Sequence, residues 1–434
     1  MIKFIDKPFR MVLEYIINYL VDHIIIWPFY VFIRYRMHII RPLNSNGISI
    51  LALNVERFRG DLESLSENGF TIFKMPYAWQ TRIFYAYKDR DDTDNFFLQK
   101  TDNKRIKKDR TRVRKYIKKL LKKIFSTMEI DCTIGANLFY NQDIDWGSVS
   151  SDLGYPYIVL HRENLVVNDN FYDIFIERAK KLKIIGFSGD SIVFHNNVVS
   201  DIYKEYSGVP CEKIHAFGAI RMDSFISKIN TGYQSSFLNN KKVVTFFYFH
   251  PRAGILSEKD FGFYNLHDHV LSSFILLAKS NPGIEFIIKH KGLRWEKAQP
   301  ILDNLQADCI NNLNISGPED NAQEIIFKST VITGFCSTAV LESAIAAKPI
   351  VFPLFDEALE NEYISFLCFK DCLNMFDIAR SVNEYSSLIM KRLEYNVVDN
   401  DVMKLRRTKF EELVSPLSGD ASKKYRKLIE KLCS

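Results

Sequence analysis

The sequence has few cysteines, and none lies in a pattern typical of metal binding. Its 434 residues include seven, which are scattered apart from Cys368 and Cys372, four positions from each other. A structural zinc site usually takes two ligands from a CxxC pair, with histidines or further cysteines nearby. The sequence therefore argues against such a site, and the odd, scattered set of thiols indicates a reducing compartment.

Closely spaced acidic pairs are also lacking at the ends of predicted strands, where a divalent ion would be held against a sugar nucleotide. Asp143 and Asp145 have the spacing, but they precede a predicted helix and have no phosphate-binding partner in the sequence. We therefore expect no metal and no resident cofactor. Internal repeats and low-complexity segments are absent as well.

A long apolar run without charge is missing, although residues 11–33 resemble one at first sight. Glu14 and Asp22 interrupt the run and Pro28 breaks it, and a charge at mid-bilayer costs about 2.5–3.5 kcal/mol. No small-residue cleavage site follows, so a signal peptide is not indicated either. We expect residues 1–45 to be an amphipathic, apolar and basic segment that either lies on a membrane surface or packs on the protein.

The chain does have the composition of an ordinary globular protein, with 47% hydrophobic and 25% charged residues. Its length exceeds what one hydrophobic core usually serves, so two domains of roughly 200 residues each are expected. The 34 phenylalanines and 21 tyrosines indicate a well-filled interior.

The net charge of +6 is concentrated, with the densest basic run at residues 100–123. A stripe of Ile106, Val113, Ile117 and Leu121 indicates that this run is a helix. Three explanations stay open for its charge: a solvated helix face, a contact with anionic lipids, and nucleic-acid binding. Nucleic acid ranks last because no recognition module accompanies the run, and we expect no nucleic-acid partner.

Apolar strand-like runs alternate with helix-like segments in both halves of the chain. In the first half the predicted strands are 48–54, 69–75, 129–140, 155–164, 183–187, 191–194 and 213–217. In the second half they are 243–249, 284–290, 314–317, 331–335 and 349–353, with helices at 265–280, 295–307 and 339–347. Such alternation is typical of α/β proteins with mostly parallel sheets.

A polar stretch without periodicity, residues 225–240, separates the two series and predicts a linker. We expect four parts: the N-terminal segment 1–45, a first Rossmann-like domain 46–228, a second one 241–385, and a helical tail 386–434. The charged tail could return to the first domain or meet a membrane.

Residues 331–353 read as a strand, a small polar turn, a helix and a second strand. Ser337 and Thr338 stand where the helix begins, and its first amides and its dipole favour a phosphate there. Glu342, one turn further on, could accept hydrogen bonds from a ribose. The alternative is an ordinary capped helix between two buried strands.

Polar clusters follow four other predicted strands, where ligands collect in open α/β sheets. They are residues 161–164, 218–223, 250–252 and 289–292. Glu163 and Asp223 in the first two clusters could serve glycosyl transfer as a carboxylate pair, or form structural ion pairs with Arg162 and Arg221.

The clusters of the second half are basic. His250 and His290 could donate to phosphate oxygens, or be structural histidines at strand ends. Lys289 and Lys291 add positive charge for a phosphate, or are solvated lysines.

Several of these residues together resemble motifs of GT-B glycosyltransferases that build bacterial surface polysaccharides such as lipopolysaccharide O-antigen or capsule. They are the GxxRxD turn of 218–223, the strand ending in His250-Pro251, and the helix with Ser337-Thr338…Glu342. The resemblance implies two Rossmann-like domains facing across a cleft, with helical N-terminal and C-terminal additions. Within the family, the chain looks most like the retaining β-Kdo transferases, which use CMP-Kdo.

The resemblance implies a role for each matching residue. Asp223 would be the nucleophile, Glu163 the acid/base on the acceptor side, and His250 the partner of the donor phosphate. The nucleotide side would comprise Ser337, Thr338, Glu342, His290, Lys291 and Arg252. The acceptor side would comprise His161, Arg162 and Arg221. The partners implied are a nucleotide-sugar, a lipid-linked or oligosaccharide acceptor and a membrane surface, for an enzyme peripheral at the inner face of the cytoplasmic membrane.

Three alternatives stay open. Teichoic-acid-type glycerophosphotransferases share the Ser-Thr…Glu helix. UDP-N-acetylglucosamine 2-epimerases have a motif similar to residues 161–164, but in their second domain, whereas here it lies in the first half. A non-catalytic scaffold of a polysaccharide assembly is the third alternative.

Overall fold

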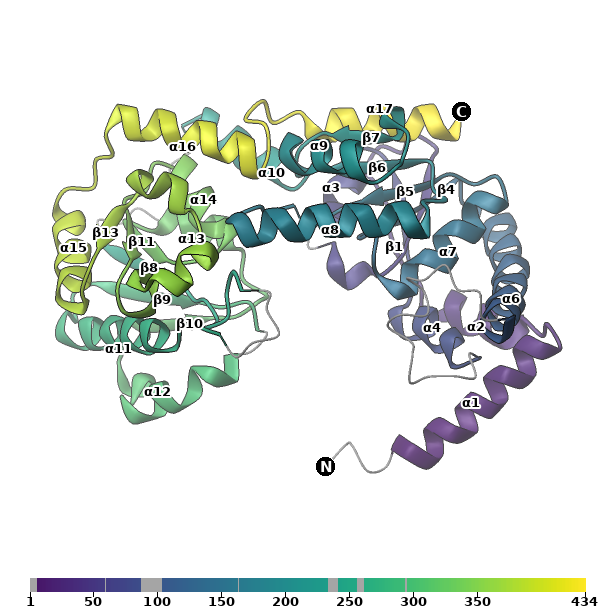
Figure 1. The fold of residues 1–434 in the computed structure, drawn as a ribbon, viewed down its shortest axis with the longest axis horizontal. Helices are drawn as coiled ribbons and strands as arrows, with labels where there is room; N and C mark the ends of the chain where they lie inside the picture. The colour runs from purple at the N-terminus through teal and green to yellow at the C-terminus, as the bar shows by residue number, and fades with distance from the viewer. Residues whose placement is uncertain are drawn as a thin grey trace. The chain divides into compact units, whose positions relative to one another are not determined.

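The computed structural model describes residues 6–58, 60–86, 104–162, 164–232, 241–255, 261–292 and 295–434 (Figure 1). The chain forms two compact units. Unit 1 comprises residues 1–164, 176–223 and 418–434, and unit 2 comprises residues 165–175 and 224–417.

Unit 1 is built on a seven-stranded sheet of order β1-β3-β2-β4-β5-β6-β7. The strands are β1 (His38–Ile40), β2 (Ser49–Ala52), β3 (Thr71–Lys74), β4 (Cys132–Gly135), β5 (Tyr157–Leu160), β6 (Ser191–Phe194) and β7 (Ile214–Ala216). All neighbours pair in parallel except β1, which runs antiparallel to β3 at the edge. The central strands β4, β5 and β6 are buried along their whole length, as expected for a sheet covered on both faces.

The helices of the first part of the chain are α1 (Asp6–Asp22), α2 (Trp27–Arg36), α3 (Asp61–Glu67), α4 (Tyr77–Arg82), α6 (Lys104–Met128), α7 (Asn141–Asp152), α8 (Asp169–Ile185), α9 (Asn197–Tyr206) and α10 (Met222–Asn230). The predicted basic helix is α6, which buries Val113, Ile117 and Leu121. The division between the units falls within α8 and within α10.

Unit 2 has a six-stranded, fully parallel sheet of order β10-β9-β8-β11-β12-β13. Its strands are β8 (Val243–Phe247), β9 (Glu285–Lys289), β10 (Leu313–Ser316), β11 (Val331–Gly334), β12 (Ile350–Pro353) and β13 (Asp377–Ala379). Its helices include α11 (Tyr264–Ser280), α12 (Gln299–Asn304), α13 (Ala322–Lys328), α14 (Thr338–Ile345), α15 (Val382–Glu394) and α16 (Asn400–Leu413).

The expected helical tail, residues 386–434, is divided between the units. Helices α15 and α16 belong to unit 2, whereas α17 (Ala421–Cys433) belongs to unit 1. Ala421, Tyr425 and Ile429 are spaced by one helical turn each, and all three are buried in the core of the first sheet. The end of the chain thus returns to the first unit.

The N-terminal segment forms two helices instead of one. Among the described residues, no single helix is long and apolar enough to cross a membrane, and Met11–Asp22 and Trp27–Arg36 meet that criterion only as a pair bent by 114°.

The structure confirms the α/β class and most predicted strands. The strand predicted at 183–187 is wrong, because residues up to Ile185 end α8. Strands β1 and β13 were not predicted, since each has only three residues and no clear alternation. The predicted linker 225–240 begins too early, because α10 continues to Asn230, while residues 233–240 lie outside the described ones.

Candidate functional site

The strand order of unit 2 reverses beside β8, the first strand of its sheet in chain order. Strands β9 and β10 follow on one side of β8, and β11, β12 and β13 on the other. In open parallel sheets, ligands bind outside the carboxyl ends of the strands at such a switch point. The segments that leave this edge follow β8, β9 and β11, and they contain the basic clusters and the polar turn predicted from the sequence.

His250 follows strand β8, and His290 follows the neighbouring strand β9. In each ring one nitrogen makes a hydrogen bond within its own loop. Nδ1 of His250 accepts the Arg252 N–H at 3.1 Å, and Nδ1 of His290 accepts the Gly292 N–H at 3.0 Å. A nitrogen that accepts holds no proton, so each neutral ring has its proton on Nε2. Burial and the charge of Lys289 lower the pKa of His290, which favours this neutral form. Both rings can therefore donate from Nε2 to an oxygen anion.

Ser337 and Lys291 meet at the same edge although they leave different strands. Lys291 Nζ donates to the Ser337 hydroxyl at 3.4 Å, and this hydroxyl also accepts the Ala339 N–H at 3.3 Å as the N-cap of α14. Because β8 lies between β9 and β11, the contact joins the segments on both sides of the switch point. An ammonium, a hydroxyl and the positive end of a helix dipole are thus grouped where a phosphate would bind.

The rest of the predicted nucleotide side lies along α14. Thr338 is half-buried at the first position of the helix. Glu342 is buried one turn further on, and its carboxylate accepts from Gln323 Nε2 at 3.5 Å. A carboxylate at this depth can accept from ribose hydroxyls that enter beside the helix.

A second helix of unit 2, α11, provides a comparison for α14. The Glu357 carboxylate accepts the Asn265 and Leu266 N–H groups at 2.7 and 2.9 Å, so an internal anion already occupies the start of α11. The start of α14 is capped by the neutral Ser337. An external anion therefore fits the start of α14 better than the start of α11.

Lys289 differs from Lys291, although both belong to the predicted basic cluster. Lys289 is buried and donates to the carbonyl oxygens of His290, at 3.1 Å, and of Gly317, and burial lowers its pKa. Lys291 is exposed. Lys289 thus stabilises the loop, and Lys291 is the lysine placed to meet a ligand.

The turn before α14 is joined covalently to another loop of unit 2 by the disulfide Cys336–Cys368. The scattered cysteines of the sequence predict reduced thiols, and this pair, whose members are 32 positions apart, corrects that prediction. Gly254, in the segment after β8, packs against it: a Cβ at that position would lie 2.6 Å from Cys368 Sγ. The segment after β8 and the turn before α14 therefore both lie close to this disulfide.

At the corresponding edge of unit 1, the predicted arginines form ion pairs. Arg162, after β5, pairs with Asp61 at the start of α3, and also donates to the Phe58 carbonyl. Arg221 approaches the same carboxylate at 3.8 Å. The side chains of Asp61 and Arg162 are 3% and 9% exposed, so this is a buried cluster in which one carboxylate lies close to two guanidinium groups. No sequence pattern indicates a role for Asp61, because it follows no predicted strand.

His161 is fully buried beside this cluster. Its Nδ1 accepts the Leu138 N–H at 3.4 Å. Asn164 accepts the His195 N–H at 3.2 Å, and burial together with the nearby arginines lowers the pKa of His195 well below its usual range. These groups support the loops after β5 and β6, and the structure gives His161 a packed, internal position.

The predicted catalytic carboxylates are Asp223 and Glu163, and the structure describes only Asp223. The Asp223 carboxylate accepts the Ala421 and Ser422 N–H groups at 3.2 and 2.7 Å, so it caps the start of α17. Glu163 lies outside the described residues. The nucleophilic role of Asp223 stays a prediction. The structure shows a second, structural role for its carboxylate as the cap of α17.

Asp143, whose spacing from Asp145 is that of a metal-binding pair, is a buried acid of unit 1. One of its oxygens accepts from Gln80 Nε2 at 2.8 Å, and Gln80 Oε1 accepts the Asn54 N–H. Burial raises the pKa of Asp143 to about 7. The described residues contain no group of three or more histidine, cysteine or acidic side chains arranged to hold a metal ion.

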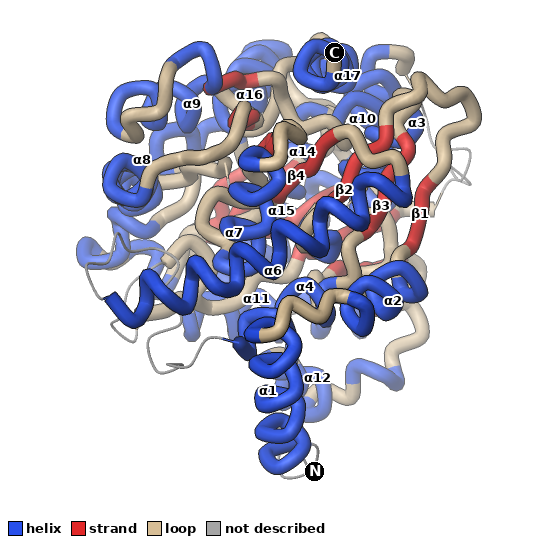
Figure 2. Tube along the Cα trace, turned by 90° about the vertical axis from the view of Figure 1, so that its right-hand side faces the viewer, coloured by secondary structure: helices blue, strands red, loops and turns tan. Residues whose placement is uncertain are grey.

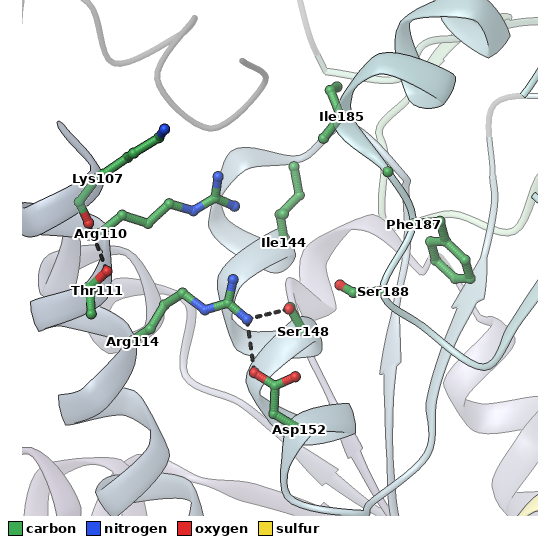
Figure 3. Close-up of a pocket in the computed structure, with 11 residues that line it drawn as sticks. Lys107, Arg110, Thr111, Arg114, Ile144, Ser148, Asp152, Ile185, Phe187 and Ser188 are labelled. Carbon is green, nitrogen blue, oxygen red and sulfur yellow. Dashed lines mark hydrogen bonds and ion pairs between the residues drawn. The ribbon is translucent and has the colours of Figure 1, made fainter. Parts of the chain in front are cut away.

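A cavity of about 570 Å³ lies on another part of unit 1 (Figure 3). Lys107, Arg110 and Arg114 of α6 face α7 and the turn 185–188 across it, and Arg114 contacts Ser148 and Asp152. The turn leads into the amino end of β6, whereas the predicted site residues follow carboxyl ends. None of the predicted site residues lines this cavity.

Comparison with family models gives no match, and no curated protein matches the chain. Solved structures do match in fold. A structure of S. aureus MnaA with UDP is 11% identical with a TM-score of 0.50, and the match covers 88% of this chain and 96% of that one. A putative UDP-N-acetylglucosamine 2-epimerase from Listeria monocytogenes is 12% identical, with the same score and coverage. This chain has a GT-B-like fold. The fold class expected from the sequence, two Rossmann-like α/β sheets, is therefore confirmed.

Proposed function

We propose that this protein binds a nucleotide-sugar at the switch point of unit 2 and transfers the sugar to a glycan acceptor. The observation that supports this best is the contact of Lys291 with Ser337 across the end of β8, at the start of α14. A GT-B-like fold and the Nε2–H donors of His250 and His290 agree with it.

The chemistry needed from unit 2 is stabilisation of a leaving nucleotide. When the bond between sugar and phosphate breaks, negative charge grows on the phosphate oxygens. Neutral histidine N–H groups, the Lys291 ammonium and the amides of α14 would stabilise this charge. They would therefore stabilise the transition state more strongly than the bound donor in its ground state. Glu342 would hold the ribose.

The donor we propose is CMP-Kdo, with a lipid-linked or oligosaccharide acceptor of a bacterial surface polysaccharide. The support is the resemblance of the 218–223 turn, His250-Pro251 and the α14 helix to β-Kdo transferases. In this proposal Asp223 is the nucleophile, and Glu163 assists the acceptor. His161, Arg162 and Arg221 belong to the acceptor side, where the buried positions of the first two make them supporting groups.

The test is nucleotide release from CMP-Kdo and from UDP-sugars, with and without a lipid-linked glycan. CMP release that requires the acceptor supports the proposal. The variants Lys291→Ala and Ser337→Ala should each weaken CMP binding about tenfold in calorimetry, since hydrogen bonds to charged groups are worth about 1.5–3 kcal/mol. Lys279→Ala, which removes an exposed lysine from the last turn of α11, is the matched control and should bind normally. CMP binding that is unchanged in all three variants would contradict the site.

A UDP-N-acetylglucosamine 2-epimerase is the second candidate, supported by the likeness in fold to a putative enzyme of this kind from Listeria monocytogenes. It predicts conversion of UDP-N-acetylglucosamine without any acceptor. Transfer of glycerophosphate from CDP-glycerol would indicate the glycerophosphotransferase instead, and the absence of thermal stabilisation by any nucleotide would indicate a scaffold.

A further inference from the structure

Helices α1 and α2 of unit 1 each present an outward stripe of large apolar side chains. On α1 the stripe is Met11, Val12, Tyr15, Ile16 and Tyr19, which are 46–75% exposed. On α2 it is Trp27, Val31, Phe32 and Tyr35, which are 47–81% exposed. Both stripes repeat every four residues, so each lies along one face of its helix. An ordinary surface helix would be polar on this face.

The opposite face of each helix is fixed to unit 1, so the stripes do not result from detached helices. Ile17 and Val21 of α1, and Phe29 and Ile33 of α2, are buried. Polar contacts join the same helices to α6: Arg112 donates to Asn18 Oδ1 at 3.1 Å. The described structure thus holds apolar side chains outward on two anchored helices.

Two further contacts come from aromatic side chains. Tyr116 of α6 donates to the Ile25 carbonyl at 2.9 Å, between α1 and α2. The Tyr30 hydroxyl contacts Thr127 Oγ1 at 3.1 Å. Figure 2 shows α1 and α2 beside the long helix α6.

The exposed face of α6 is strongly basic and adjoins these stripes. Its exposed cationic residues are Lys104, Arg105, Lys107, Lys108, Lys115, Lys118, Lys119 and Lys122. Lys123, half-buried, has its Nζ 5.7 Å from the centre of the Trp27 ring. The only acid of α6, Asp109, is buried. Positive charge and outward aromatic rings therefore lie next to each other.

A cavity of about 460 Å³ lies where the end of α1 meets α6. Its lining includes Lys107, Lys108, Arg112 and Lys115 against one carboxylate, Asp22, which already pairs with Arg112. The cavity is thus positively charged and large enough for a phosphate group.

We propose that α1, α2 and the exposed face of α6 form a docking surface for a bilayer that contains anionic lipids. The two stripes would enter the interface, where tyrosine and tryptophan are favoured, and the lysines of α6 would contact the headgroups. The charge of the surface selects this occupant. A second copy of the chain would bring the same positive charge against it, and a nucleic acid would leave the apolar stripes uncovered. The proposal concerns unit 1 alone and does not depend on the proposed transferase activity.

The test is co-sedimentation of the full chain with vesicles of phosphatidylcholine, and of equimolar phosphatidylcholine and phosphatidylglycerol. We expect binding to the anionic vesicles only, and weaker binding as salt rises. The variant Lys115→Gln, Lys118→Gln, Lys122→Gln should reduce the bound fraction about tenfold or more, because each lysine near an anionic surface contributes to attraction. The matched control is Lys423→Gln, Lys427→Gln, Lys431→Gln on α17, which lies away from α1 in Figures 1 and 2 and should bind as the unchanged chain does.

A second variant tests the apolar stripes: Tyr15→Ser, Tyr19→Ser, Trp27→Ser, Tyr35→Ser. It should lose vesicle binding at every salt concentration, while its thermal unfolding stays close to that of the unchanged chain, because all four side chains are exposed. Equal binding of all variants would overturn the proposal. Failure of the unchanged chain to bind anionic vesicles would also overturn it. A dimer that this variant dissociates would then identify a second copy as the occupant, and RNA binding that the α6 variant abolishes would identify a nucleic acid.

Discussion

The carboxyl edges of the two sheets carry polar groups of different kinds. In unit 1 the charged side chains contact groups of the protein itself: Asp61 lies close to Arg162 and Arg221, and Asp223 caps α17. In unit 2 the groups that follow β8 and β9 are donors: the rings of His250 and His290, whose Nδ1 atoms accept backbone N–H groups, and Lys291, which contacts Ser337 at the start of α14. A buried ion pair destabilises the fold when one partner is removed, whereas an edge with a surplus of donors is suited to an anionic ligand.

The largest expected effect tests the structural side of this comparison. Asp61→Ala leaves the buried Arg162 without its carboxylate, which should lower the free energy of unfolding by about 3–5 kcal/mol in urea denaturation. Glu63→Ala, which removes a more exposed pair with Lys74, should cost at most about 1 kcal/mol. A similar small cost for both variants would contradict a structural role for the Asp61 cluster.

The next largest effect tests the hydrogen-bond donors at the carboxyl edge of the unit 2 sheet. If His250 donates to the leaving phosphate as we propose, His250→Ala should lower kcat by about 100-fold to 1000-fold while thermal unfolding stays nearly unchanged. His269→Ala is the control, because His269 lies exposed on α11 and pairs with Asp356. Equal turnover of the two variants would show that His250 does not stabilise the leaving group.

Asp143 extends the comparison to pH, since it is a buried acid of unit 1 that accepts from the neutral Gln80 side chain. Its pKa is raised to about 7 in the folded chain, against about 3.9 when unfolded. The folded state therefore binds more protons between these values, and the stability contributed at low pH is lost as pH rises from about 4 to 7.

Between pH 4 and pH 7, the free energy of unfolding of Asp143→Asn should change by about 2 kcal/mol less than that of the unchanged chain. The full difference between the folded and unfolded pKa values sets an upper limit of about 4 kcal/mol for this effect. The Asn side chain keeps an oxygen for Gln80. Urea denaturation at pH 4, 6 and 8 measures the difference. Parallel stability curves for the variant and the unchanged chain would argue against a raised pKa.

The smallest effect separates two roles of Asp223. Asp223→Ala should lower the free energy of unfolding by about 1 kcal/mol, as loss of a helix cap does. Ser381→Ala, which removes the cap of α15 in unit 2, should cost about the same. If Asp223→Asn abolishes transfer while Ser381→Ala leaves it intact, Asp223 acts beyond capping.

The sequence by itself determined the fold class and the positions of most strands. Periodic apolar runs decide burial locally, and a run such as 331–335 has few other ways to bury its side chains. The residues after β8, β9 and β11 could be selected for the same reason, because parallel strands bring their carboxyl ends to one edge.

The tertiary structure alone decided what each polar group contacts. The pairing of Asp61 with Arg162, the capping of α17 by Asp223 and the disulfide Cys336–Cys368 join residues far apart in the sequence. Such contacts depend on how helices and loops pack over the sheets, which no local pattern encodes. The outward stripes of α1 and α2 also became visible only once the structure showed which of their faces is buried.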